Sequence, residues 1–191
     1  MNIFSLADLL TTLRLLLVPV YVWCFVEARA EAAFWVFVVA GFTDVIDGTV
    51  ARLLGKSTRL GSILDPIADK LLMGTCFITL TMVGRLPVWF LVLALTRDVI
   101  LMGGIFYFEK IRANIHYRPL RLSKLATLCQ LLTAGLALLF WWQPVVQGGR
   151  WGDVFWIALS ASALLIAVSG VMYISQGIRM LATFRNNHER S

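Results

Sequence analysis

Apolar residues fill six long runs of the chain, and short groups of polar or charged residues separate them. The runs cover about 9–26, 32–52, 63–84, 87–109, 122–142 and 154–178. A helix needs about 20 mostly apolar residues to cross a hydrocarbon core of about 30 Å. The pattern predicts an all-α integral membrane fold: six transmembrane helices behind a short amphipathic N-terminal segment, residues 1–8.

Composition supports this class. Hydrophobic residues make up 59% of the 191 residues and charged residues only 15%, which is far from a typical soluble domain. We expect a single membrane domain over 1–191. The net charge of +6 does not indicate a nucleic-acid partner, because the basic residues are spread over short loops. Cys24, Cys76 and Cys129 lie in separate apolar runs and are interpreted as core residues.

The distribution of Lys and Arg predicts the orientation. With a cytoplasmic N-terminus, the inner segments hold eleven basic residues: Arg52, Lys56, Arg59, Lys110, Arg112, Arg118, Arg121, Lys124, Arg179, Arg185 and Arg190. The outer segments hold three: Arg29, Arg85 and Arg150. Ala28-Arg29-Ala30 resembles a signal-peptidase site, but no basic residue precedes the first run, so we expect a retained span.

The seven tryptophans agree with this orientation, because all fall near the predicted outer ends of spans, where indole rings favour the membrane interface. They are Trp23, Trp35, Trp89, Trp141, Trp142, Trp151 and Trp156. Both termini and the loop near 53–62 are then cytoplasmic, and we expect the bacterial inner membrane as the location.

Four aspartates stand out against this apolar background. Asp44 and Asp47 are three residues apart in the second run, and Asp65 and Asp69 are four apart in the third. These spacings place each pair on one helix face, and the short connection makes the two spans neighbours. An aspartate costs about 2.5–3.5 kcal/mol at the centre of a membrane helix. The spans carry too few cations to neutralise four, so the cluster predicts a site for divalent cations and a phosphorylated substrate.

Small and basic residues lie between the two pairs. Gly48, Ala51 and Gly61 allow close approach of a ligand or of another helix, and both interpretations stay open for them. Arg52 follows Gly48 by one helical turn and is suited to bind a phosphate.

Together these residues resemble a known signature. Asp44-x2-Asp47-Gly48-x2-Ala51-Arg52-x8-Gly61-x3-Asp65-x3-Asp69 matches the motif of the CDP-alcohol phosphotransferases at every fixed position. The resemblance implies that an alcohol attacks the β-phosphate of a CDP-linked lipid and that CMP leaves. It implies that Asp44, Asp47 and Asp65 hold two divalent metal ions, Mg²⁺ or Mn²⁺, with Asp69 as a further ligand and as the general base. Asp44, Gly48, Ala51, Arg52 and Gly61 would form the CDP site, and the family is commonly homodimeric.

The acceptor is indicated by weaker resemblances. The opening NIFSLADLLTTLRLLLVPV is similar to the glycerol-type branch, which contains phosphatidylglycerophosphate synthases and CMP-forming cardiolipin synthases. Arg97-Asp98 is more similar to the cardiolipin synthases, and so is Ser123-Lys124-x2-Thr127-x2-Gln130, although Ala126 stands where an Asn is common.

These segments, with the basic residues between them that could gather an anionic headgroup, supply the candidate acceptor residues: Arg97, Asp98, Arg112, Arg118, Lys124 and Thr127. The alternatives are a structural tie for Arg97-Asp98 and simple contact with anionic lipid for Arg112, Arg118 and Arg121. Lys124 and Thr127 have the alternative of snorkelling and interhelical hydrogen bonding. We assign no role to His116 or His188.

The sequence predicts transfer of a phosphatidyl group from CDP-diacylglycerol to phosphatidylglycerol, giving cardiolipin and CMP. Glycerol 3-phosphate is the alternative acceptor. A divalent-cation transporter and a structural membrane scaffold are alternatives from other classes. A transporter predicts metal flux without nucleotide dependence, and a scaffold predicts that Asp65→Asn leaves function intact.

Overall fold

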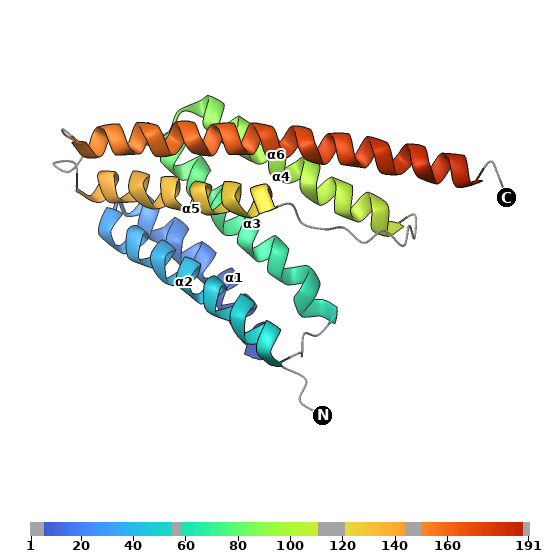
Figure 1. The fold of residues 1–191 in the computed structure, drawn as a ribbon. Helices are drawn as coiled ribbons and strands as arrows, with labels where there is room; N and C mark the ends of the chain where they lie inside the picture. The colour runs from blue at the N-terminus through green and yellow to red at the C-terminus, as the bar shows by residue number, and fades with distance from the viewer. Residues whose placement is uncertain (1–5, 55–58, 111–120, 144–149, 189–191) are drawn as a thin grey trace. The chain divides into compact units, whose positions relative to one another are not determined.

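The described residues form six α-helices, which confirms the all-α expectation (Figure 1). A computed structural model describes residues 6–54, 59–110, 121–143 and 150–188, with side chains described over 12–43, 67–104, 122–143 and 150–178. The helices are α1 (Leu6–Val26), α2 (Ala30–Leu54), α3 (Arg59–Met82), α4 (Val88–Lys110), α5 (Arg121–Trp142) and α6 (Arg150–His188).

Two of these helices contain described segments long and apolar enough to cross a membrane. They are Leu122–Trp142 and Arg150–Ile178, with mean hydropathies of 1.7 and 2.2. Shorter apolar stretches of described residues cover Thr12–Val26 and Ala30–Thr43. Six transmembrane spans stay a prediction, although the six helices agree with the six apolar runs.

Helix ends differ most from the predicted spans in α6 and α3. The helix α6 has 39 residues and continues ten residues beyond the predicted end of the sixth span. At about 1.5 Å per residue it is about 58 Å long, more than a hydrocarbon core requires. The helix α3 begins at Arg59 and not near 63, so Gly61 lies inside it. Hydropathy follows only the apolar part of a helix, whereas the backbone helix can continue past that part.

The chain divides into two compact units, and α5 and α6 contribute to both. The first unit contains Met1–Pro87 and Leu131–Phe155, and the second contains Val88–Gln130 and Trp156–Ser191. The first unit thus holds α1, α2 and α3 with the second half of α5 and the first residues of α6.

In the first unit, α1 packs against both α2 and α3. Tyr21 of α1 is fully buried, and its hydroxyl forms a 2.9 Å hydrogen bond with Thr79 Oγ1 of α3. Thr79 also donates to the carbonyl oxygens of Thr75 and Cys76. Because a buried hydroxyl needs a partner, this contact fixes how α1 and α3 meet. Cys24 and Cys76 are buried there, as expected for core residues.

Helices α2 and α5 meet at Gly41 and Gly135, where an added Cβ atom would make ordinary van der Waals contact with the other helix. A Cβ atom placed on Gly41 would lie 3.6 Å from Leu131, and one on Gly135 would lie 3.9 Å from Phe37. Ala33 and Ala40 of α2 are fully buried. Packing through small residues and dispersion contacts is typical of helices within a membrane.

Tight turns set the direction of the first helices. Ala28 adopts a left-handed conformation with φ of 53° between α1 and α2, and Arg29 N–H donates to the Cys24 carbonyl at 2.9 Å. Gly84 adopts the same left-handed conformation after α3, with φ of 70°. Glycine adopts it without a steric penalty because it has no Cβ atom. In Figure 1, α2 therefore runs antiparallel to α1 and α3.

Candidate active site

All four aspartates of the signature lie within helices. Asp44 and Asp47 are in the C-terminal half of α2, and Asp65 and Asp69 are in the N-terminal half of α3. Gly48, Ala51 and Arg52 are in α2, and Gly61 is in α3. The side chain of Asp69 is half-buried; the side chains of the other seven residues lie outside the described ones.

The connection between α2 and α3 restricts how far apart their ends can be. Residues 55–58 join Leu54 to Arg59, so these two residues are at most about 18 Å apart even with a fully extended chain. Both helices also pack on α1. The acidic segments consequently start from the same end of the first unit.

Helix register places the aspartates in two levels. Asp44 lies ten residues before the end of α2 and Asp69 lies ten residues after the start of α3, which is about 15 Å from the connection in each case. Asp47 and Asp65 lie seven and six residues from it, or about 9–10 Å. The backbone thus aligns the aspartates as two pairs, one helical turn apart.

Two cations that the sequence analysis did not consider occur in this unit. Arg14 of α1 is fully buried, and half-buried Lys70 follows Asp69 in α3. Measured from the α1–α2 turn, Arg14 lies twelve residues from Val26 and Asp44 lies fourteen residues from Ala30, about 18 Å and 21 Å. Arg14 is therefore level with Asp44 and Asp69, the pair that lies farther from the connection between α2 and α3.

The signal for Arg14 was present in the sequence, because an arginine within an apolar run needs a compensating group. With Lys70, it adds two positive charges to that of Arg52 in α2. The four carboxylates supply the oxygen ligands that hard divalent cations prefer. Within the described residues, no group of three or more His, Cys, Asp or Glu side chains gathers as a metal site; Asp44, Asp47 and Asp65 are outside that comparison.

We expect Arg14→Gln to lower kcat/KM for CMP release by about 10- to 100-fold, because it removes a buried positive charge level with the aspartates, and interactions with charged groups contribute about 1.5–3 kcal/mol. Arg14→Lys keeps the charge and should retain more activity. Arg29→Gln is the matched control: Arg29 is exposed, and its guanidinium lies 5.4 Å from the Trp23 ring centroid at the far end of α1. Equal activity of Arg14→Gln and Arg29→Gln would show that Arg14 has no part in the site.

In the second unit, the two segments that indicated the acceptor meet each other. Arg97 of α4 is only 3% exposed. Its Nη1 donates to Asp98 Oδ1 at 2.8 Å, and its Nη2 donates to Ser123 Oγ at 2.6 Å and to the Ser123 carbonyl at 3.3 Å. Thr127 Oγ1 donates to the same carbonyl at 3.1 Å.

The remaining acceptor candidates differ in their surroundings. Lys124 is exposed and Thr127 is half-buried in the first turns of α5. Gln130 is 1% exposed, and its Nε2 has no hydrogen-bond partner among the described residues. Arg112, Arg118 and His116 lie outside the described residues. Whether these groups bind an acceptor stays a prediction.

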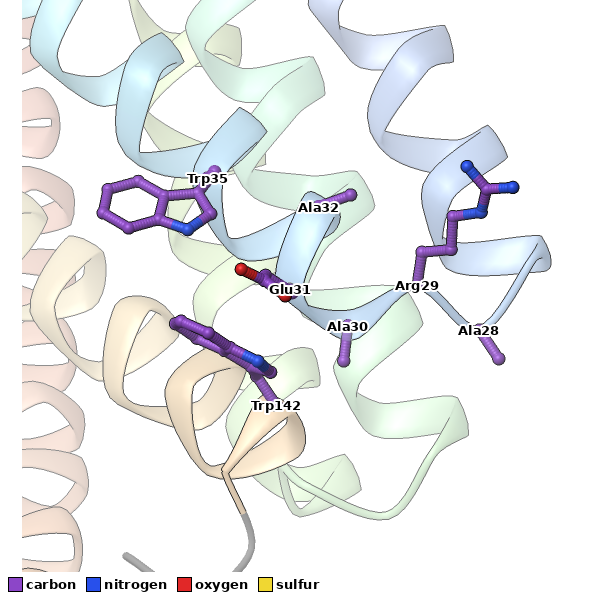
Figure 2. Close-up of a pocket in the computed structure, with 7 residues that line it drawn as sticks. All are labelled: Ala28, Arg29, Ala30, Glu31, Ala32, Trp35 and Trp142. Atoms are coloured by element: carbon purple, nitrogen blue, oxygen red, sulfur yellow. The ribbon is translucent and has the colours of Figure 1, made fainter.

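Figure 2 shows a cleft beside the α1–α2 turn, and this turn lies at the end of α2 opposite its acidic segment. Its lining residues come from the α1–α2 turn, from α2 and from the end of α5: Ala28, Arg29, Ala30, Glu31, Ala32, Trp35 and Trp142. Glu31 is 23 residues from the end of α2, about 35 Å from the connection to α3. The indole rings of Trp35 and Trp142 are 6.4 Å apart. This cleft, with two tryptophans in its lining, is separate from the acidic segments.

Comparison with known proteins identifies the fold and the chemistry together. The sequence pattern of the CDP-alcohol phosphatidyltransferases matches residues 4–172. The chain belongs to the CDP-alcohol phosphatidyltransferase family. Like that family, it is an integral membrane enzyme that transfers a phosphatidyl group from a CDP-alcohol donor. The predicted recognition of this family is confirmed.

Curated CDP-alcohol phosphatidyltransferases similar to the chain differ in their named products. A probable phosphatidylglycerophosphate synthase of Mycobacterium tuberculosis is 33% identical, over 96% of this chain and 87% of the relative. A probable CMP-forming cardiolipin synthase of Drosophila melanogaster is 34% identical, over 72% of this chain and 48% of the relative. The CMP-forming cardiolipin synthase of Rattus norvegicus is 32% identical, over 72% of this chain and 51% of the relative.

Proposed function

We propose that the protein transfers the phosphatidyl group of CDP-diacylglycerol to phosphatidylglycerol, with cardiolipin and CMP as the products. The observation that supports this acceptor is the contact between Arg97-Asp98 and the Ser123 segment. Both segments resemble cardiolipin synthases, they are 26 residues apart, and they share a 2.6 Å hydrogen bond. The two segments that separately indicated this acceptor are thus in direct contact, one in α4 and the other in α5.

Glycerol 3-phosphate is the second candidate acceptor. The mycobacterial phosphatidylglycerophosphate synthase aligns over nearly the whole chain, whereas the cardiolipin synthases align over 72% of it. Either acceptor presents a glycerol hydroxyl as nucleophile and a phosphate as anion, so Lys124 suits both.

The proposed chemistry uses the two aspartate levels. Asp44, Asp47 and Asp65, with Asp69 as a further ligand, would hold two divalent cations, which offset the charge of the pyrophosphate when bound. Asp69 accepts the proton of the acceptor hydroxyl as it attacks the β-phosphate. Asp44, Gly48, Ala51, Arg52 and Gly61 surround the CDP group, with Arg52 on a phosphate. The acyl chains stay in the bilayer, and CMP leaves toward the cytoplasm.

This proposal includes six membrane spans, cytoplasmic termini, a cytoplasmic active site and a homodimer. The exposed tryptophans near helix ends support the placement of the interfaces: Trp23, Trp35, Trp89, Trp151 and Trp156 are 51–59% exposed, as suits side chains at a lipid headgroup level.

An acceptor panel tests the proposed acceptor. Purified protein with CDP-diacylglycerol and Mn²⁺ is offered phosphatidylglycerol, glycerol 3-phosphate, serine or inositol phosphate, and the lipid product is identified. We expect cardiolipin with phosphatidylglycerol, at a kcat/KM at least about tenfold above that for glycerol 3-phosphate, a difference of about 1.4 kcal/mol in transition-state binding. If phosphatidylglycerophosphate is the preferred product, the acceptor is glycerol 3-phosphate and the proposal of phosphatidylglycerol is wrong.

A further inference from the structure

Arg97 is a buried charge whose surroundings define what it can do. It lies in the middle of α4, an otherwise strongly apolar helix, and is 3% exposed. A charged side chain buried in an apolar segment has to be paired and hydrogen-bonded. Both terminal nitrogens of Arg97 meet that requirement, one with Asp98 and the other with Ser123, whereas Nε has no hydrogen-bond partner among the described residues.

Ser123 is held from two sides. Its hydroxyl accepts a hydrogen bond from Arg97, and its carbonyl accepts bonds from Arg97 and from Thr127. Ser123 is the third residue of α5, where a helix otherwise has only local contacts to prevent fraying. The guanidinium therefore joins the first turn of α5 to the middle of α4.

We propose that Arg97 is a positioning residue that acts through Ser123. It fixes the first turn of α5 so that exposed Lys124 presents its ammonium group to the phosphate of the acceptor. The inference rests on the proposed function for the identity of the ligand. It differs from direct binding of the acceptor by Arg97, because the two terminal nitrogens are already engaged and the side chain is buried, whereas Lys124 is exposed.

The planar fork of arginine explains the residue type. It donates to Asp98 and Ser123 in two fixed directions, which the single ammonium of lysine cannot do with the same geometry. Arg97→Lys should consequently fall between wild type and Arg97→Gln in acceptor affinity.

A double-mutant cycle tests action through Ser123 and Lys124. The variants are Arg97→Gln, Ser123→Ala, Lys124→Gln and the two combinations of Arg97→Gln with the others. We expect Arg97→Gln to raise the acceptor KM about tenfold, with the KM for CDP-diacylglycerol unchanged within about twofold. The acceptor KM of each double variant should exceed that of its more affected single variant by less than about twofold, because the effects of residues that act as one unit are not additive. Ser123→Ala keeps the fold as a mild change and should raise the same KM.

Tyr21→Phe is the matched control, since it removes another buried interhelical hydrogen bond, that between Tyr21 and Thr79. A merely structural role predicts equal effects of Tyr21→Phe and Ser123→Ala on both KM values. Multiplicative effects in the cycle, or an unchanged acceptor KM in Ser123→Ala, would overturn the proposal in favour of direct contact.

Amide hydrogen exchange gives a readout without turnover. In Arg97→Gln, amides of residues 123–127 should exchange at least about tenfold faster than in wild type, while those of α1 keep their rates. If wild type transfers nothing to any glycerol-type acceptor, the proposed function fails, and exchange alone decides whether Arg97 fixes this turn. Unchanged exchange at 123–127 would overturn the positioning role.

Discussion

Replacing Asp69 by asparagine is expected to lower kcat for CMP release by about 10²–10⁴-fold, the range that general-base catalysis contributes. Asparagine has nearly the same size but cannot accept the proton of the acceptor hydroxyl. Asp69 lies in α3, ten residues from its start, and its side chain is half-buried. The measurement is initial-rate release of CMP in detergent micelles with saturating donor and acceptor.

Asp153→Asn is the control for the Asp69 variant. Asp153 is an exposed aspartate in the first turn of α6, and its rate should stay within about twofold of wild type, as is usual for exposed charges. Thermal unfolding of both variants shows whether the fold persists. A folded Asp69→Asn protein with a rate within tenfold of wild type would exclude Asp69 as the base.

Removal of divalent cations is expected to reduce CMP release to the background rate, and Mg²⁺ or Mn²⁺ should restore it. Like charges this close disfavour one another, and bound metal would offset the charge of the carboxylates and of the pyrophosphate. The experiment compares the rate in EDTA with the rate after titration of each metal. Full activity in EDTA would contradict a metal-assisted reaction.

A thermal shift separates metal binding from turnover. A ligand at 100 times its Kd stabilises the folded state by about 2.7 kcal/mol. Mn²⁺ should raise the unfolding temperature of wild type by several degrees and leave Asp65→Asn unshifted, with Asp153→Asn again as control. An equal shift in all three proteins would place the metal outside the aspartate cluster.

Hydropathy predicted the helices well because each apolar run is long enough to require a helix in a membrane. It could not predict where α6 stops or that α3 starts at Arg59, since neither end depends on apolar composition. The spacing of the aspartates, together with a short connection, also predicted that α2 and α3 carry the site.

Arg14 shows what the sequence pattern left out. The polar residues between the aspartates were considered, but the buried Arg14 lies 30 residues before Asp44, in α1. Only the packing of α1 on α2 and α3 reveals that it shares their level. In the same way, Arg97 and Ser123 were separate indications until the structure joined them.

Transfer of the intact phosphatidyl group is the central claim, and isotopic labelling tests it most directly. Purified protein receives CDP-diacylglycerol with deuterated acyl chains, unlabelled phosphatidylglycerol and Mn²⁺, and lipids and CMP are quantified by mass spectrometry. We predict cardiolipin with one deuterated and one unlabelled phosphatidyl group, formed in equal amount to CMP, and neither product in Asp65→Asn. CMP without any labelled phosphatidyl product, or no CMP at all with every glycerol-type acceptor, would contradict the account.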